Sequence, residues 1–170
     1  MVNMAKHISI SFDLSEMFDK VGEETAIKGS KLSDINPISF ERTELTENYK
    51  GLILDDMRRS LGVLTFSLRK YGARRENVHG GKENNYSIEA DVPEGFDESM
   101  VEELRNVMNT YIKYQALFKW YGEMLGLQDA TSFLERSNES LMQVMMMVSR
   151  RLAPTRTAPA EKTRESCNFE

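Results

Sequence analysis

A basic segment in the middle of the chain offers the most direct chemistry in the sequence. The stretch RKYGARRENVHGGK holds five positive side chains and one glutamate, in a chain whose net charge is −5. The positive residues of this basic segment are Arg69, Lys70, Arg74, Arg75 and Lys82. Such a group can bind phosphates or an acidic face of a partner protein. It can equally be a solvated helix end, where positive charge suits the helix dipole.

The other reactive residue types form no catalytic or metal-binding pattern. His7 and His79 are the two histidines, Cys167 is the single cysteine, and no spacing such as H-x-x-x-H is present. The stretch HGGK lacks the glycine spacing and the Ser or Thr of a phosphate-binding loop, and no nucleophile motif occurs. We therefore expect a protein that is not an enzyme, without catalytic residues, cofactor or metal.

A methionine-rich segment, SLMQVMMMVSRRL, is the second distinctive feature. Seven of the eight residues from Leu141 to Val148 are apolar, whereas a surface helix shows one apolar face. A helical stripe predicts a core face made of Leu134, Leu141, Met145, Val148 and Leu152. Methionine adapts to imperfect fit and is common on binding surfaces. Copper binding would require His or Cys nearby, and neither residue type is present in this segment. We assign Met142, Met146 and Met147 to a subunit interface, with burial in the subunit's own core as the alternative.

The aromatic stretch YIKYQALFKWYGEML interleaves aromatic side chains with lysines. Such a pattern can stack on nucleic-acid bases, but here most of the aromatic residues follow one helical stripe, which favours core packing. Tyr114 and Trp120 fall off that stripe. Because aromatic residues are enriched at protein interfaces, we predict that both contact another subunit.

Hydrophobic periodicity predicts an α+β fold that is mostly α. Apolar residues recur at three- and four-residue steps in four predicted helices, over residues 15–28, 49–71, 100–125 and 129–152. Apolar residues alternate with polar ones in two predicted strands, over residues 7–14 and 86–92, and the second could pair with the first. We expect a bundle of about four helices, two of them long, with a small two- or three-stranded β element. A two-stranded ribbon is marginal alone, so it must pack on the helices or be completed by another chain.

Local signals mark where these elements begin and end. Gly29 and Gly126 are predicted to end helices, and Gly72 lies just past the end of another. Asp97 or Ser99 is expected to cap the helix that follows, with Ser99 opening an S-x-x-E capping box. The stretch GARRENVHGGKENN has no apolar period and predicts a loop.

The chain is expected to form one domain and a terminal arm. Residues 1–152 suit a single helical domain, whereas residues 153–170 are rich in Pro, Thr, Arg, Glu and Ser and predict an extended or disordered arm. Phe169 could anchor that arm on a neighbour. The sequence contains neither a signal-peptide core nor about 20 consecutive apolar residues, so we expect no membrane contact.

The order of these elements resembles the head–tail connector proteins of tailed bacteriophages, which form rings between the portal and the tail. The resemblance rests on the helix over 49–71, the strand NYSIEADV, the helix over 100–125 and the tail from Pro154, not on a motif. It implies a ring of identical subunits in a virion assembled in the host cytoplasm, with portal or tail proteins as neighbours. It also implies that Arg74 and Arg75 face the DNA channel or the portal.

We expect one of two functions. The first, which the resemblance implies, is that of a structural assembly protein, a ring-forming head–tail connector subunit. The alternative is a small cytoplasmic regulator that binds nucleic acid through the basic segment over 69–82, which salt-dependent DNA binding would favour.

Overall fold

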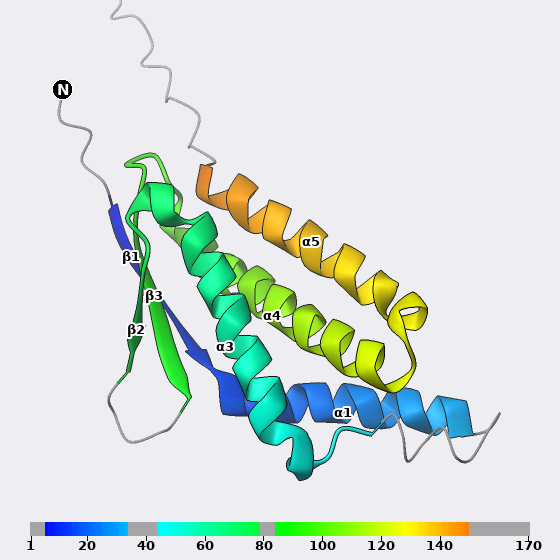
Figure 1. The fold of residues 1–170 in the computed structure, drawn as a ribbon. Coiled ribbons are helices and arrows are strands. Elements are labelled where there is room, and N and C mark those ends of the chain that lie inside the picture. Colours follow the sequence, from blue (N-terminus) through cyan, green and yellow to red (C-terminus); the bar gives the residue numbers. More distant parts are fainter. Residues whose placement is uncertain (1–5, 34–43, 79–83, 150–170) are drawn as a thin grey trace, which may run out of the picture.

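The computed structural model describes residues 6–33, 44–78 and 84–149 (Figure 1). Within these residues lie four α-helices, three short 3₁₀ turns and a three-stranded antiparallel sheet. The helices are α1 (Leu14–Ser33), α3 (Lys50–Ser67), α4 (Val101–Met124) and α5 (Leu127–Ser149), and the strands are β1 (Lys6–Asp13), β2 (Arg74–Asn77) and β3 (Asn85–Val92). The 3₁₀ turns are η1 (Glu47–Tyr49), η2 (Arg69–Tyr71) and η3 (Glu98–Met100). The predicted α+β, mostly α fold class is confirmed.

The sheet has the order β1-β3-β2, so β3 is central and the predicted pairing of the first strand with residues 86–92 is confirmed. Ile10 lies opposite Ile88, and both are buried against the helices. The other face is polar: His7 lies opposite Asp91, with its Nδ1 3.1 Å from the Asp91 carboxylate. Alternation thus separates a core face from a polar face, as the pleat of a strand requires.

The structure corrects the loop predicted after Gly72, because residues 74–77 form β2 and pair with β3. All four side chains of β2 are exposed. A strand at the sheet edge without a buried face has no reason to alternate apolar and polar residues, so periodicity could not reveal it. The chain reaches β2 through Gly72, whose φ of 66° is left-handed and readily adopted by glycine.

The helix ends differ in part from those predicted. The Asp13 carboxylate caps α1 by accepting bonds from the backbone N–H groups of Ser15 and Glu16, at 3.0 and 3.1 Å. Gly29 does not end this helix: it is buried inside α1, which continues to Ser33. Glycine ends a helix when it adopts a left-handed conformation, as Gly126 does with a φ of 106°.

Asp97 caps the turn that leads into α4. Its carboxylate accepts a 3.0 Å bond from the backbone N–H of Ser99 and a 2.7 Å bond from its hydroxyl. Asp97 is therefore the cap of η3, whereas Met100, at the N-cap position of α4 itself, makes no side-chain capping bond.

The central helix of the structure is α4. It packs on α5 along one side and on α3, α1 and β1 along the others (Figure 1). Its Tyr121 ring stacks on Phe133 of α5, with ring centroids 5.1 Å apart, and its Trp120 ring meets Tyr49 edge-on at 4.9 Å. Because α4 is covered on several sides, more than one stripe of its surface is buried.

Stability should fall at high pH because of Tyr121. Burial raises the pKa of its phenol to about 12, and the Glu24 carboxylate adds to this. In the unfolded chain the pKa is about 10, so the unfolded state loses the proton first. The stability contributed by the neutral phenol is complete below about pH 10 and declines as pH rises toward 12. We expect the free energy of unfolding to drop by about 2 kcal/mol across that range.

Urea unfolding from pH 8 to 12 measures this decline. Other groups titrate there too, so the comparison is with Tyr121→Phe. The Tyr121 hydroxyl has no hydrogen-bond partner among the described residues, so this variant should stay folded. Its pH profile should be flatter than the wild type's; two parallel profiles would contradict the prediction.

Candidate interaction surfaces

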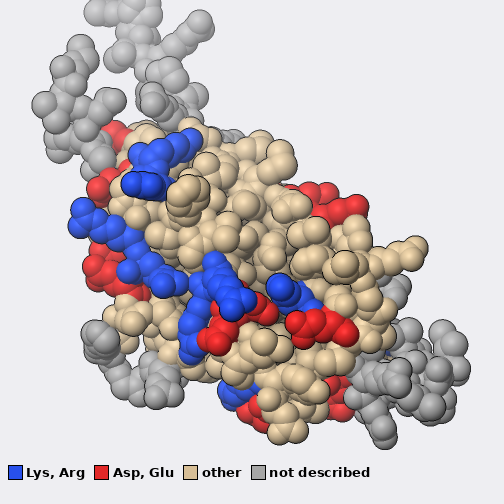
Figure 2. All heavy atoms as spheres, in the orientation of Figure 1, with Lys and Arg blue, Asp and Glu red and all other residues tan. Residues whose placement is uncertain are grey.

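A basic surface lies over α3 and β2. Four residues of the basic segment are exposed and gather here: Arg69 and Lys70 on η2, and Arg74 and Arg75 on β2. Figure 2 shows positive side chains concentrated over these elements. Lys82 lies outside the described residues. The structure therefore brings together the part of the basic segment that it describes.

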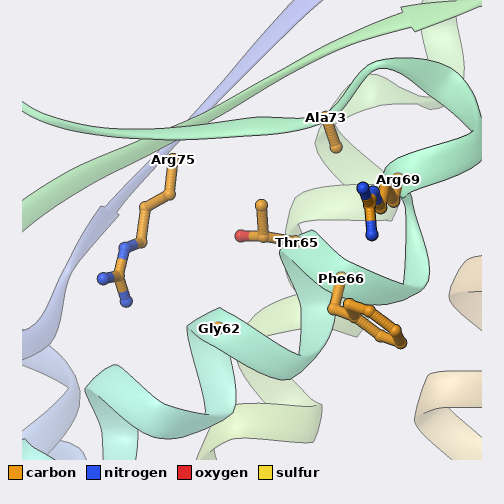
Figure 3. Close-up of a pocket in the computed structure, with 6 residues that line it drawn as sticks. All are labelled: Gly62, Thr65, Phe66, Arg69, Ala73 and Arg75. Atoms are coloured by element: carbon orange, nitrogen blue, oxygen red, sulfur yellow. The ribbon is translucent and has the colours of Figure 1, made fainter.

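A shallow pocket of about 510 Å³ opens between α3 and β2 on this surface (Figure 3). The pocket is lined by Gly62, Thr65, Phe66, Arg69, Ala73 and Arg75. In Figure 3 the side chains of Arg75 and Arg69 lie on opposite sides of it. Phe66 is 70% exposed, and Val63 on the same helix is also exposed. The surface thus combines positive charge with an exposed aromatic ring.

The part of this surface nearest the sheet is held by a hydrogen-bonded network. Arg58 Nε donates a 3.0 Å bond to the Tyr86 hydroxyl, and its guanidinium also pairs with Asp55. Burial lowers the pKa of Arg58, but its bonds with Tyr86 and Asp55 outweigh this and raise the pKa above its ordinary value. Arg75 donates a 3.0 Å bond to the Arg58 carbonyl and lies over the Tyr86 ring. These contacts fix both guanidinium groups in place.

Three positive residues of the basic surface have no acidic partner, although the Lys70 ammonium lies 4.8 Å from the centroid of the Tyr71 ring. Arg69, Lys70 and Arg74 make no ion pair within residues 6–33, 44–78 and 84–149. By contrast, Arg59 pairs with Asp56 and Lys113 with Glu24. Positive charge is thus left uncompensated around η2 and the start of β2.

The methionine-rich segment divides between the core and the surface. Met142 and Met146 are 66% and 67% exposed, so these two residues are available to another molecule. Met147 is 9% exposed and lies on the buried face of α5, three residues after the buried Val144. The assignment of Met147 to an interface is therefore corrected, because its side chain is covered by its own subunit.

The core face of α5 also differs from the predicted stripe. Leu134, Leu141 and Met145 are half-buried, and Leu152 lies outside the described residues. The buried face consists of Ala130, Phe133, Ser137, Ser140, Val144, Met147 and Val148. Two serines lie in the middle of this face: Ser137 accepts a 2.7 Å bond from Gln115 Nε2, and Ser140 donates a bond to the Arg136 carbonyl. Because these two buried serines are polar, the pattern of apolar residues did not reveal the buried face of α5.

The two aromatic residues assigned to an interface lie elsewhere. Trp120 is 1% exposed and packs on Tyr49, so it belongs to the core and its assignment is corrected. Tyr114 is half-buried beside Phe133, and its hydroxyl is 3.5 Å from Arg136. Phe169 and the predicted arm lie outside the described residues.

An acidic pair that the sequence analysis did not single out adjoins the exposed methionines. Glu135, Glu139, Met142 and Met146 follow one another at steps of four, three and four residues, which places them on one exposed face of α5. We call these four residues the α5 stripe. Neither glutamate makes an ion pair with any residue that the structure describes. Figure 2 shows acidic side chains over α5, away from the basic surface.

The described residues hold no group of three or more His, Cys, Asp or Glu side chains placed to bind a metal ion. No helix among residues 6–33, 44–78 and 84–149 has the length and apolar character needed to span a membrane. Comparisons with models of protein families, with curated proteins and with solved structures found no match. The contacts and charges of the chain itself are therefore what any functional argument must use.

Proposed function

We propose that this protein is a non-enzymatic assembly protein, a ring-forming subunit of the head–tail connector type. The supporting observation is that exposed apolar side chains lie one helical turn apart on two different helices. Val63 and Phe66 are exposed on α3, and Met142 and Met146 on α5. Clustered exposed apolar residues mark interaction sites. Two unlike surfaces suit a heterologous contact, in which each copy offers one surface to each neighbour, and such contacts form a ring where the rotation between copies closes.

The composition of the surfaces fits contact between proteins. Burying a methionine or phenylalanine side chain contributes about 1.5–3 kcal/mol, so Phe66, Met142 and Met146 together could hold a contact that repeats around a ring. Methionine adapts its shape to the surface it meets, and arginine and phenylalanine are enriched at interfaces. In this proposal the ring forms in the host cytoplasm and enters the virion, with portal and tail proteins as neighbours and DNA passing through the ring.

Charged substitutions on α5 test the proposal. The variant with Met142→Lys and Met146→Lys should be monomeric, because lysine at both positions places charge in the apolar contact. Its helical content should match the wild type, because both side chains are exposed in the subunit. Light scattering measures the size of wild type and variant, and circular dichroism measures their helicity.

Leu127→Lys is the matched control. Leu127 is 70% exposed on the same helix, but it lies about 22 Å from Met142 along the axis. This control should assemble like the wild type. A wild type that stays monomeric up to millimolar concentration, or a methionine variant that assembles normally, would refute the proposal.

A nucleic-acid-binding regulator is the second candidate, and the pocket of Figure 3 is the observation that favours it. Arg69 and Arg75 could contact phosphates while the exposed Phe66 stacks on a base. A monomer that binds a DNA oligonucleotide with strong salt dependence would support this function in place of assembly.

A further inference from the structure

We propose that the α5 stripe of one copy packs antiparallel on α3 of the next copy. The receiving surface, which we call the α3 stripe, consists of Val63 and Phe66 on α3 and Lys70 on η2, the 3₁₀ turn that follows α3. This inference rests on the proposed function, because it requires the chain to associate with itself. It adds which surfaces meet, in which direction and at which register.

The spacing of the residues supports one register. In two antiparallel helices of equal rise, residues that lie opposite each other have numbers with a constant sum. Met146 opposite Val63 gives 209, and Met142 opposite Phe66 gives 208. Carried one turn past Phe66 into η2, the same register places Glu139 at the level of Lys70. Each apolar residue of the α5 stripe thus meets an apolar residue of α3, and an acid meets a base.

Charge distinguishes this direction from the parallel one. A parallel alignment that pairs Met142 with Val63 would place Glu139 at the level of Ser60, beside Arg59, but Glu135 at the level of Asp56, beside Asp55. Like charges facing each other would oppose that contact. In the antiparallel alignment Glu135 lies beyond Lys70, past the end of α3, and so faces no acidic residue of that helix. Glu139 then approaches positive charge, and neither glutamate faces an acid.

The charges that meet are those left uncompensated within the subunit. Glu135 and Glu139 are adjacent like charges at i,i+4, an arrangement that costs a helix stability unless a partner neutralises it. Neither is paired within the residues that the structure describes, and the same holds for Lys70 and Arg74. A second copy brings Lys70 to Glu139 and so supplies a partner for both residues.

The shape of α3 suits the incoming methionines. Gly62 lines the open pocket beside Phe66, and a side chain at its position would meet no atom within 4 Å. Met146 lies opposite residues 62 and 63 in this register and can enter that space. Met142 lies over the Phe66 ring, where a thioether makes a favourable contact with an aromatic edge.

A mixing experiment tests whether the two stripes bind each other. Phe66→Asp blocks the α3 stripe but leaves the α5 stripe intact, and Met142→Lys does the reverse. Each variant alone should be monomeric. Their equimolar mixture should form a dimer of one copy each, because one complete contact remains and no ring can close. Analytical ultracentrifugation up to millimolar concentration separates these species.

The other outcomes each overturn a different statement. If Phe66→Asp dimerises alone, the α5 stripe binds itself and the antiparallel α3–α5 contact is wrong. If the wild type assembles but the mixture stays monomeric, the stripes do not bind each other, although the proposed function stands. If the wild type does not assemble, the proposed function fails, and this contact fails with it.

Charge reversal tests the register. Glu139→Lys and Lys70→Glu should each weaken assembly about tenfold, by turning an attraction into a repulsion. The chain carrying both changes should recover, because each reversed residue again meets its opposite. Glu123→Lys, at an exposed acid on α4, is the control and should have no effect. Weakening without recovery in the double variant would overturn the register. Lost affinity of Lys70→Glu for a DNA oligonucleotide, with assembly unchanged, would assign the α3 stripe to nucleic acid instead.

Discussion

Replacing Trp120 by alanine is expected to lower the free energy of unfolding by about 3–5 kcal/mol. Trp120 is 1% exposed, and its ring packs edge-on against Tyr49, which is at the start of α3. Truncation removes the largest buried side chain of α4. It leaves a cavity between α4 and the start of α3, which the close-packed interior cannot fill by moving inward. Small domains are stable by about 5–15 kcal/mol, so this loss would remove a large part of the total free energy of unfolding.

Chemical denaturation measures this loss directly. Phe118→Ala is the matched control, since Phe118 lies two residues earlier on α4 and is half-buried. It removes an aromatic ring of similar size and should cost clearly less. A Trp120→Ala variant that unfolds at the wild-type denaturant concentration but no longer assembles would restore the interface assignment made from the sequence.

Periodicity predicted the elements whose buried face is apolar throughout. In β1 and β3 every second residue lies on the inner face of the sheet and is apolar, as Ile8, Ile10 and Phe12 are. This alternation predicted both strands, and the two strands pair as expected. The helices α3 and α4 were located in the same way. In each case most of the residues packed on the rest of the chain are apolar and recur at the period of the element, which is the condition under which a sequence pattern reports a structure.

The elements that were missed or misread lack such a face. β2 has four exposed side chains, and pairing at the sheet edge is supplied by backbone groups that every residue carries. On α5 the contact with α4 passes through Ser137 and Ser140, which are buried with their hydrogen bonds satisfied. A count of apolar residues therefore shifted the core face and placed Met147 outside it.

Trp120 was misplaced for a different reason. A residue off the main stripe of a helix is exposed when the helix has one covered side, and that condition does not hold for α4. Its neighbours cover it from several directions, so residues off the stripe are also buried. The sequence could not show how many elements surround one helix, because this depends on tertiary packing.

The candidate surfaces were predicted in part. The excess of positive charge over residues 69–82 and the surplus of methionines on α5 were visible in the sequence. Phe66 was not singled out, although it is apolar and off the stripe of its helix, the same signal that was applied to Trp120. Glu135 and Glu139 became candidates for a contact only when the structure showed that they make no ion pair with the described residues and lie beside exposed methionines. Which charges are paired depends on side-chain placement, and sequence alone does not provide it.

Replacing Met147 by lysine should destabilise the subunit by about 3 kcal/mol, whereas lysine at Met146 should change its stability by less than about 0.5 kcal/mol. The two residues are neighbours in sequence and identical in type, so helix propensity and net charge change equally. They differ in burial: Met147 is 9% exposed and Met146 is 67% exposed. A lysine at 147 loses the buried contacts of the methionine and places its ammonium group against the core, where charge is costly unless paired.

Thermal unfolding followed by circular dichroism, combined with light scattering at the same concentration, separates the two effects. Met146→Lys should not assemble, and it should unfold at the same temperature as the wild-type monomer. Met147→Lys should unfold at a clearly lower temperature, so any loss of assembly follows from loss of the folded subunit. Equal unfolding temperatures for the two variants would mean that the α5 face packed on α4 is not the one the structure shows. The α5 stripe would then no longer be the exposed surface, and the contact between copies would lose its physical basis.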